Sequence, residues 1–263
     1  MSNIHPTAII EDGAKIGENV TIGAFVRVSS KASIGDRCII ESHTVIDGKT
    51  TIGTDNHIFS HAVIGSIPQD LKYAGEEVEL IIGNHNKIRE FTLFNPGTAG
   101  GGSVTKIGNN NLFMGFVHLG HDVIIGNRCI LANGATLAGH VELGDNVVIG
   151  GLTPIHQFVH IGDFAMIAGA SALSQDVPPY CLAEGNRAIL RGLNLIGLRR
   201  HINKEDINKL KIVYRKLFES GEPLQESVER LLKEKNSKTI KNLLEFVAKS
   251  KRGIPFTRKN ING

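Results

Sequence analysis

Residues 119–149 read LGHDVIIGNRCILANGATLAGHVELGDNVVI, and a large apolar residue returns at every sixth position. The same spacing holds from Ile4 to Ile64 and stays in phase at Ile82 and Ile88. After a slip of one residue it resumes from Ile107 to Leu173. A period of six is neither helical nor that of a plain alternating strand, so the chain must turn a corner in each hexad. The pattern predicts a hexapeptide β-helix.

The fifth place of most hexads is small, as at Ala32, Cys38 and Ala62. Places one and five lie four residues apart, so both side chains point to the interior. Three hexads then make a triangular coil. Glycine often holds the second place, as at Gly35 and Gly126, and we expect it to bend the backbone there with a positive φ. An ordinary β-sandwich is the alternative, but sandwiches do not keep an unbroken six-residue period.

We expect a mainly β protein, with a left-handed parallel β-helix of hexapeptide repeats over residues 1–186 and an α-helical domain over residues 187–263. The hexads break near residues 69–81 and 94–106, where the sequence is polar or glycine-rich. Loops that leave a rigid scaffold often carry binding groups, so we expect substrate contacts there. They could also be insertions without a role.

Beyond Pro179 the apolar period becomes helical. Asn203 resembles an N-terminal cap, and we expect Gly221 to end the first long helix and Pro223 to begin the next. A third apolar stretch follows over residues 240–247. We expect this bundle to cover the open end of the prism.

Composition bounds the location and the partners. The chain has 263 residues, no Trp and three Cys, two of which, Cys38 and Cys129, fall on the inward fifth place. Cysteines without evident pairing indicate a reducing compartment, and neither a leader nor an apolar run of membrane-spanning length is present. We therefore expect a cytoplasmic protein without an integral membrane segment.

The charge is uneven along the chain. Residues 187–263 hold nineteen Lys and Arg against eight Asp and Glu, whereas the whole chain has a net charge of only +3. No recognition motif for nucleic acid accompanies this basic region, and an acidic protein partner fits it as well. We expect no nucleic-acid binding.

A triangular prism offers flat faces rather than a deep cleft, and a groove between neighbouring prisms makes a better pocket. We therefore expect a homotrimer with its sites between subunits.

Several of the eleven histidines should lie close together. Successive coils stack about 4.8 Å apart. His121 and His140 are separated by one coil plus one place, His156 lies two coils minus one place from His121, and His118 is on the same coil as His121. Histidine is the side chain best suited to accept and return a proton near neutral pH. A wall histidine without a chemical role is the alternative, and we assign that structural role to the stacked pair His43 and His61.

Six segments carry a family resemblance: Gln69 to Gly75, His118 to Asp122, Gly126 to Asn133, Ala135 to Val141, Ile155 to Phe158 and Gln175 to Tyr180. They closely resemble the acyl-carrier-protein-dependent UDP-N-acetylglucosamine O-acyltransferases, which begin lipid A biosynthesis. The likeness spans nearly the whole chain, including the helical region.

The resemblance implies the chemistry. His121 would be the general base that removes the proton from the sugar 3-hydroxyl, which then attacks the thioester of a 3-hydroxyacyl chain. Asp122 would orient or stabilise His121, and the backbone N–H of Gly139 would face the oxyanion. No cofactor or metal is implied, because the acyl chain arrives on the phosphopantetheine of acyl carrier protein.

The resemblance also implies the binding residues. Asp70 and Lys72 would hold the sugar and the diphosphate of UDP-N-acetylglucosamine, and Gly169 would mark where side-chain size limits a long acyl chain. The remaining groove residues would be His118, His140, His156, Gln157, Asn194 and Arg200. The basic helices would dock the acidic carrier protein.

The sequence departs from the best-known members at Asn95 and Pro96, where they carry His and Arg, and at Ile196, where they carry an acid. These departures leave open a 3-amino analogue of the sugar as acceptor, which would give an amide. A zinc lyase that resembles the γ-class carbonic anhydrases is the alternative from another reaction class, because such enzymes also use histidines between β-helix subunits. A related N-acyltransferase and a non-catalytic scaffold are further alternatives.

Overall fold

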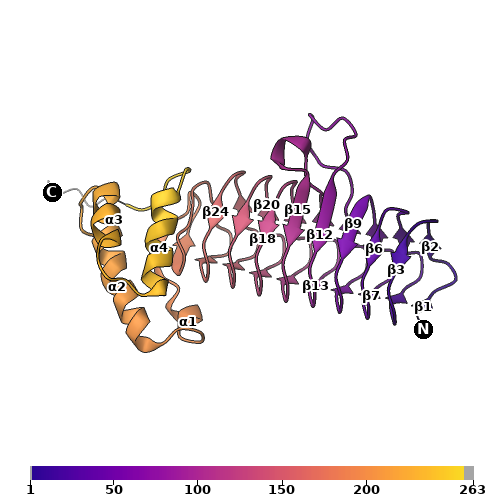
Figure 1. Cartoon of the computed structure of the whole chain (residues 1–263), viewed down its shortest axis with the longest axis horizontal. Helices are drawn as coiled ribbons and strands as arrows, with labels where there is room; N and C mark the ends of the chain where they lie inside the picture. The colour runs from indigo at the N-terminus through magenta and orange to yellow at the C-terminus, as the bar shows by residue number, and fades with distance from the viewer. Residues whose placement is uncertain (1, 258–263) are drawn as a thin grey trace.

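The chain forms a triangular prism that is covered by helices at one end (Figure 1). The computed structural model describes residues 2–257. Three sheets form the walls: sheet A with eleven strands, sheet B with eight and sheet C with eight. The chain visits them in the order A, B, C, and neighbouring coils pair in parallel. This is the left-handed parallel β-helix that the hexads predict.

Most strands are only two residues long, since each wall takes the same two places of a hexad. Sheet A consists of β1 (Asn3–Ile4), β4 (Thr21–Ile22), β7 (Ile39–Ile40), β10 (His57–Ile58), β13 (Lys87–Ile88), β16 (Leu112–Phe113), β19 (Ile130–Leu131), β22 (Val148–Ile149), β25 (Met166–Ile167), β26 (Cys181–Glu184) and β27 (Ile189–Leu193). Sheet B consists of β2 (Ile9–Ile10), β5 (Arg27–Val28), β8 (Val45–Ile46), β11 (Val63–Ile64), β14 (Leu93–Phe94), β17 (His118–Leu119), β20 (Thr136–Leu137) and β23 (Pro154–Ile155). Sheet C consists of β3 (Lys15–Ile16), β6 (Ser33–Ile34), β9 (Lys49–Ile52), β12 (Glu79–Ile82), β15 (Val104–Ile107), β18 (Ile124–Ile125), β21 (Glu142–Leu143) and β24 (His160–Ile161).

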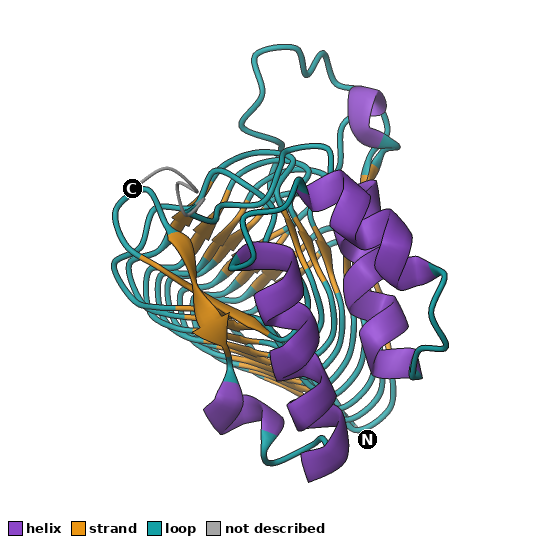
Figure 2. Ribbon diagram, turned by 90° about the vertical axis from the view of Figure 1, so that its left-hand side faces the viewer, coloured by secondary structure: helices purple, strands orange, loops and turns teal. Residues whose placement is uncertain are grey.

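Two loops leave the prism from the corner between sheets B and C. The first loop, residues 65–78, separates β11 from β12, and the second, residues 95–103, separates β14 from β15 and contains a short 3-10 turn (η1, Ala99–Gly101). They therefore lie on neighbouring coils and project together from one side of the prism (Figures 1 and 2). The breaks expected at residues 69–81 and 94–106 end earlier in the structure, because their last residues belong to strands β12 and β15.

The interior is filled by the first and fifth places of the hexads. Ile40, Val26 and the free cysteine Cys38 are fully buried there, as the sequence predicts. Three consecutive coils instead place a buried asparagine inward, which the sequence analysis missed. The backbone N–H of Asn86 donates to Asn56 Oδ1, and that of Asn111 donates to Asn86 Oδ1, each at 2.9 Å. These bonds satisfy polar groups that would otherwise be costly to bury.

The second-place glycines have a different role from the one expected. Gly35 and Gly126 do not have a positive φ, so that prediction is wrong. The left-handed conformation falls two places later, on non-glycine residues such as Asn19 and Arg128. Glycine is needed at residue 35 because the next coil is so close: a Cβ on Gly35 would lie 2.7 Å from the backbone of Gly53.

The helical region begins at α1 (Leu195–Leu198) and continues with α2 (Lys204–Phe218), α3 (Leu224–Leu232) and α4 (Lys238–Lys249). The Asn203 cap is confirmed, because its Oδ1 accepts from the Asp206 N–H at 2.8 Å, whereas α2 ends three residues before Gly221. Strand β27 still belongs to sheet A, beyond the boundary expected at residue 186. None of the helices in the described chain is long and apolar enough to cross a membrane.

Helix α4 is fastened to the last coils of the prism. Asn242 Nδ2 donates to Asp163 Oδ2 at 2.9 Å and to the Tyr180 hydroxyl at 3.1 Å, and the Ser250 hydroxyl donates to Asp176 Oδ2 at 2.7 Å. The helices thus cover the C-terminal end of the β-helix (Figure 2).

We expect Gly35→Ala to lower the melting temperature by several degrees, because the new methyl group meets backbone that cannot move aside; overpacking of this kind costs about 1–3 kcal/mol. Gly100→Ala is the matched control, since a Cβ there meets nothing within 4 Å. Differential scanning calorimetry of both variants tests this, and equal melting temperatures would contradict the close-contact explanation.

Candidate active site

The B–C corner, from which both loops leave, carries the candidate site. On the coils that follow the loops, the third place of the hexad is held by His121, Gly139 and Gln157 in turn, and the fourth by Asp122, His140 and Phe158. Residues eighteen apart are stacked neighbours along the prism, so these six residues form two adjacent rows.

His121 is paired with a buried carboxylate. Its Nδ1 lies 2.8 Å from Asp122 Oδ2, and Asp122 is 4% exposed. A carboxylate can only accept in this bond, so the imidazole carries its proton on Nδ1 and keeps the lone pair on Nε2. The Nε2 edge faces Gly139, where a Cβ would lie 2.6 Å from Nε2. A side chain at residue 139 would therefore displace the imidazole.

The backbone N–H of Gly139 is free. The backbone hydrogen bonds between successive coils do not use the N–H groups at the third place of the hexad. At the C–A corner, side chains from the next coil accept from these groups instead: Asp145 Oδ1 accepts from the Asn127 N–H at 2.7 Å. The Gly139 carbonyl accepts from Phe158 N–H at 3.1 Å, but within residues 2–257 the Gly139 N–H donates to no protein atom. A hydrogen-bond donor without a partner thus lies beside the imidazole of His121.

His140 completes the cluster. Its ring meets that of His121 edge-on, with 5.0 Å between the centroids, and stacks on Phe158 at 4.4 Å. Burial lowers the pKa of His140, while the negative charge of Asp122 partly opposes this shift. The lowered pKa favours the neutral form of the His140 imidazole.

The two loops and this corner enclose a pocket of about 330 Å³. It is lined by Asp70, Lys72, Tyr73, Glu76, Thr98, Ala99, Gly100, His140 and Phe158. Asp70 and Lys72 of the first loop therefore share one pocket with His140. Of the other lining residues, Tyr73, Thr98 and Phe158 had no role in the sequence analysis.

His118 and His156 lie beside the cluster, toward sheet B. His118 Nδ1 is 3.1 Å from the Leu93 carbonyl, a bond that it can make only as donor, and burial lowers its pKa. His156 borders a mainly apolar hollow of about 310 Å³ with Ile155 and Leu173. Both histidines thus lie next to the His121 cluster in sequence and on the sheet B side of the corner.

The other residues that the resemblance implied lie elsewhere on the chain. Gly169 is at the A–B corner, across sheet B from His121. Asn194 is buried, caps α1 by accepting from Gly197 N–H at 3.1 Å, and donates to the Phe164 carbonyl at 3.0 Å; Arg200 is exposed shortly after α1. One chain does not bring these three residues to the His121 cluster.

Comparison with known proteins identifies the family. A family description named UDP N-acetylglucosamine O-acyltransferase, domain 2, matches residues 176–255, and one for bacterial transferase hexapeptide repeats matches residues 105–139. The acyl-(acyl-carrier-protein)–UDP-N-acetylglucosamine O-acyltransferase of Sulfurovum sp. is 71% identical over 99% of this chain and 100% of its own length. That of Aliarcobacter butzleri is 67% identical over 98% and 100%. The chain belongs to this acyltransferase family.

Solved structures agree. The UDP-N-acetylglucosamine acyltransferase from Campylobacter jejuni superposes with a TM-score of 0.94 at 48% identity, over 97% of this chain and 100% of that one. The O-acyltransferase from Moraxella catarrhalis gives 0.92 at 40% identity, over 96% and 99%.

The departure from the family pattern at Asn95 has a structural explanation. Asn95 is 1% exposed, and its Nδ2 donates at 3.0 Å to the carbonyls of both Ser66 and Ile67. It therefore ties the base of the first loop to the coil of the second and does not line the 330 Å³ pocket. Ile196 is exposed on α1.

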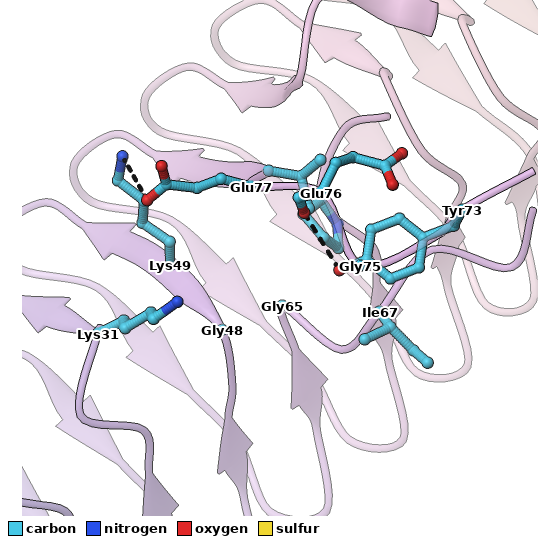
Figure 3. Close-up of a pocket in the computed structure, with 11 residues that line it drawn as sticks. Lys31, Gly48, Lys49, Gly65, Ile67, Tyr73, Gly75, Glu76 and Glu77 are labelled. Carbon is cyan, nitrogen blue, oxygen red and sulfur yellow. Dashed lines mark hydrogen bonds and ion pairs between the residues drawn. The ribbon is translucent and has the colours of Figure 1, made fainter. Parts of the chain in front are cut away.

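A second hollow, of about 440 Å³, lies against the first loop (Figure 3). Lys49 on its wall is already paired with Glu77 and Glu79. Tyr73 and Glu76 border both hollows. None of the site residues that the sequence predicts lines this second hollow.

One group in the described chain could offer a metal three ligands, namely His121, Asp122 and His140, whose ligand atoms lie within 4.8 Å of one another. Both oxygens of Asp122 already accept hydrogen bonds. The arrangement is thus that of an oriented imidazole, and the expectation that no metal takes part stays a prediction.

Proposed function

We propose that this chain transfers a 3-hydroxyacyl group from acyl carrier protein to the 3-hydroxyl of UDP-N-acetylglucosamine, the first step of lipid A biosynthesis. The names of its relatives supply donor and acceptor. The observation that carries the proposal is the imidazole of His121, oriented by Asp122, with its Nε2 beside the free N–H of Gly139.

In the proposed mechanism, His121 Nε2 removes the proton of the sugar hydroxyl as its oxygen attacks the thioester carbonyl. Asp122 stabilises the imidazolium that forms. Negative charge collects on the carbonyl oxygen, where the Gly139 N–H donates to it. The carbon–sulfur bond then breaks, the ester is complete, and the imidazolium returns its proton to the leaving thiolate. The thioester is already activated, so the reaction needs no cofactor.

The 330 Å³ pocket supports the placement of the acceptor. Asp70 offers a carboxylate to sugar hydroxyl groups, and Lys72 offers a positive charge to the diphosphate. The stacked rings of His140 and Phe158 line the same pocket. Gln157 follows Gly139 in the same row, and its side chain is exposed.

Replacing His121 with Ala should lower kcat by about 10²–10⁴-fold, because the proton acceptor is lost. His85→Ala, at the C–A corner, is the control for removal of an exposed histidine and should retain full activity. Mass spectrometry of the acylated sugar nucleotide gives the readout. An active His121→Ala enzyme would overturn the assignment of the base.

We also propose a homotrimer, because the residues of the implied groove are divided between separate surfaces of the chain. The A–B corner carries a row of stacked rings with centroids 4.9–5.1 Å apart: Phe25, His43, His61, Phe91 and Phe116. In this aromatic corner Phe91 and Phe116 are more than half exposed, as is Leu152 farther along. An exposed apolar stripe of this length is typical of an interface.

The walls that meet at the aromatic corner also turn several apolar side chains outward, beside charged ones such as Lys87 and Arg27. Sheet A turns Leu112, Ile130 and Val148 outward, and sheet B turns out Val45, Val63 and Leu93, whereas sheet C has outward charges such as Lys106 and Glu142. Three prisms with their aromatic corners on a common axis would set sheet B of one subunit against sheet A of the next. That arrangement would bring Asn194 and Arg200 of a neighbour toward His121.

The double variant Phe91→Glu/Phe116→Glu should dissociate at micromolar concentration and lose activity, because like charges would meet at the axis. Sedimentation velocity measures the mass. Ile124→Glu, which places the same charge on the exposed face of sheet C, should remain trimeric. A stable monomer of the unaltered chain would rule out the trimer.

The cationic face of α2 and the turn before it suit an acidic carrier protein. Lys209 and Lys216 are paired with Glu205 and Glu234, while no ion pair within residues 2–257 engages Arg199, Lys204, Lys211 or Arg215. Unpaired surface cations steer an acidic partner. We therefore place the docking surface for acyl carrier protein here.

Reversing the charge at Lys204, Lys211 and Arg215 together should raise KM for the acyl carrier protein donor at least several-fold, and more at low salt. KM for a small pantetheine thioester should stay unchanged. Steady-state kinetics with both donors separates the two effects, and an equal loss with each would refute the docking surface.

A cytoplasmic location stays a proposal. It is supported by three cysteines that are all buried and unpaired, as in proteins of reducing compartments.

A further inference from the structure

Thr98 binds the carboxylate of Asp122 at two points. The backbone N–H of Thr98 donates to Oδ1 at 2.9 Å, and its hydroxyl donates to Oδ2 at 2.6 Å. Oδ2 is also the oxygen that accepts from His121 Nδ1 at 2.8 Å. Thr98 and Asp122 are 5% and 4% exposed, so these bonds are shielded from bulk water.

The second loop is shaped to present Thr98 in this position. The Thr98 carbonyl accepts from Gly101 N–H at 2.9 Å and from Ser103 N–H at 2.8 Å, which closes the turn. Gly101 packs directly against the carboxylate: a Cβ on it would lie 2.0 Å from Asp122 Cγ. The close packing of Gly101 on Asp122 therefore fixes the position of the second loop over this carboxylate.

The backbone of Asp122 does not by itself decide which histidine its carboxylate faces. It sits in the left-handed conformation with φ 59°, at the fourth place of its hexad. From there its short side chain could turn toward either His121 or His140, whose Nε2 is 3.8 Å from Oδ2. The two bonds from Thr98 fix both oxygens and so select the rotamer that serves His121.

We propose that Thr98 is a positioning residue for the reaction: by binding both oxygens of Asp122, it holds the carboxylate against His121 Nδ1 and thereby keeps the lone pair of Nε2 directed at the substrate. The second loop then has a chemical purpose beyond lining the pocket. This inference rests on the proposed role of His121 as base.

Thr98→Val removes the hydroxyl donor but keeps the shape and the backbone bond. We expect kcat to fall by about tenfold, the effect of one hydrogen bond to a charged group, while KM for both substrates stays within about twofold. Thr98→Ser restores the hydroxyl and should recover most of kcat. A purely structural role would change stability, or both KM values, and would not give this split.

Thr105→Val is the matched control. Thr105 is fully buried at the root of the same loop, and its hydroxyl has no hydrogen-bond partner within the described chain. Its valine variant should match the unaltered enzyme. Gly101→Ala displaces the carboxylate of Asp122 directly and should also lower kcat, which tests the dependence of His121 on Asp122. Thr98→Ala removes the same hydroxyl and keeps the role of Thr98 testable if the Thr98→Val protein folds poorly.

Unchanged kcat in a folded Thr98→Val trimer would overturn the inference, as would a Thr98→Ser enzyme no more active than Thr98→Val. The two levels of the argument can be told apart. An inactive His121→Ala enzyme together with a fully active Thr98→Val enzyme would remove only the role of Thr98. An active His121→Ala enzyme would remove the proposed base itself.

Discussion

The hydrogen bonds between successive coils are the constraint on which the molecule depends. They hold residues eighteen apart side by side, so a one-dimensional pattern becomes a set of straight rows on the surface. Ladder bonding also leaves the third-place N–H groups unpaired at each corner. At the C–A corner asparagine and aspartate side chains satisfy them, whereas no protein atom within residues 2–257 accepts from the N–H of Gly139. The unpaired N–H of Gly139 beside the imidazole of His121 is therefore a consequence of the hydrogen-bonding pattern between the coils.

Much of this could be predicted from the sequence, because the period of a β-helix is local information. The hexads fix which residues face inward, where the two loops leave and that His121 and His140 are neighbours. Asn203 was recognisable as a cap for the same reason, since its partner is only three residues away. Signals of this kind need no knowledge of distant contacts.

The features that escaped prediction all depend on distant segments. The requirement for glycine at Gly35 comes from the backbone of the next coil and not from its own φ. Thr98 acts on a residue twenty-four positions away, through a loop whose shape no periodicity describes. Asn194 matches a substrate-binding position in the family pattern, yet its side chain caps α1 and donates to the Phe164 carbonyl within the same chain.

The coils before the first loop contribute none of the residues assigned to the site, and each pairs with the next by the same register. Removing or adding one full turn of the prism there would preserve every face and every downstream neighbour. A change of any other length within the hexads would shift the pattern, unless the extra residues leave the prism at a corner, as the two loops do. Within its N-terminal hexads the chain can therefore vary in length only in whole turns, which makes the length of the prism before the site adjustable while the site itself stays fixed.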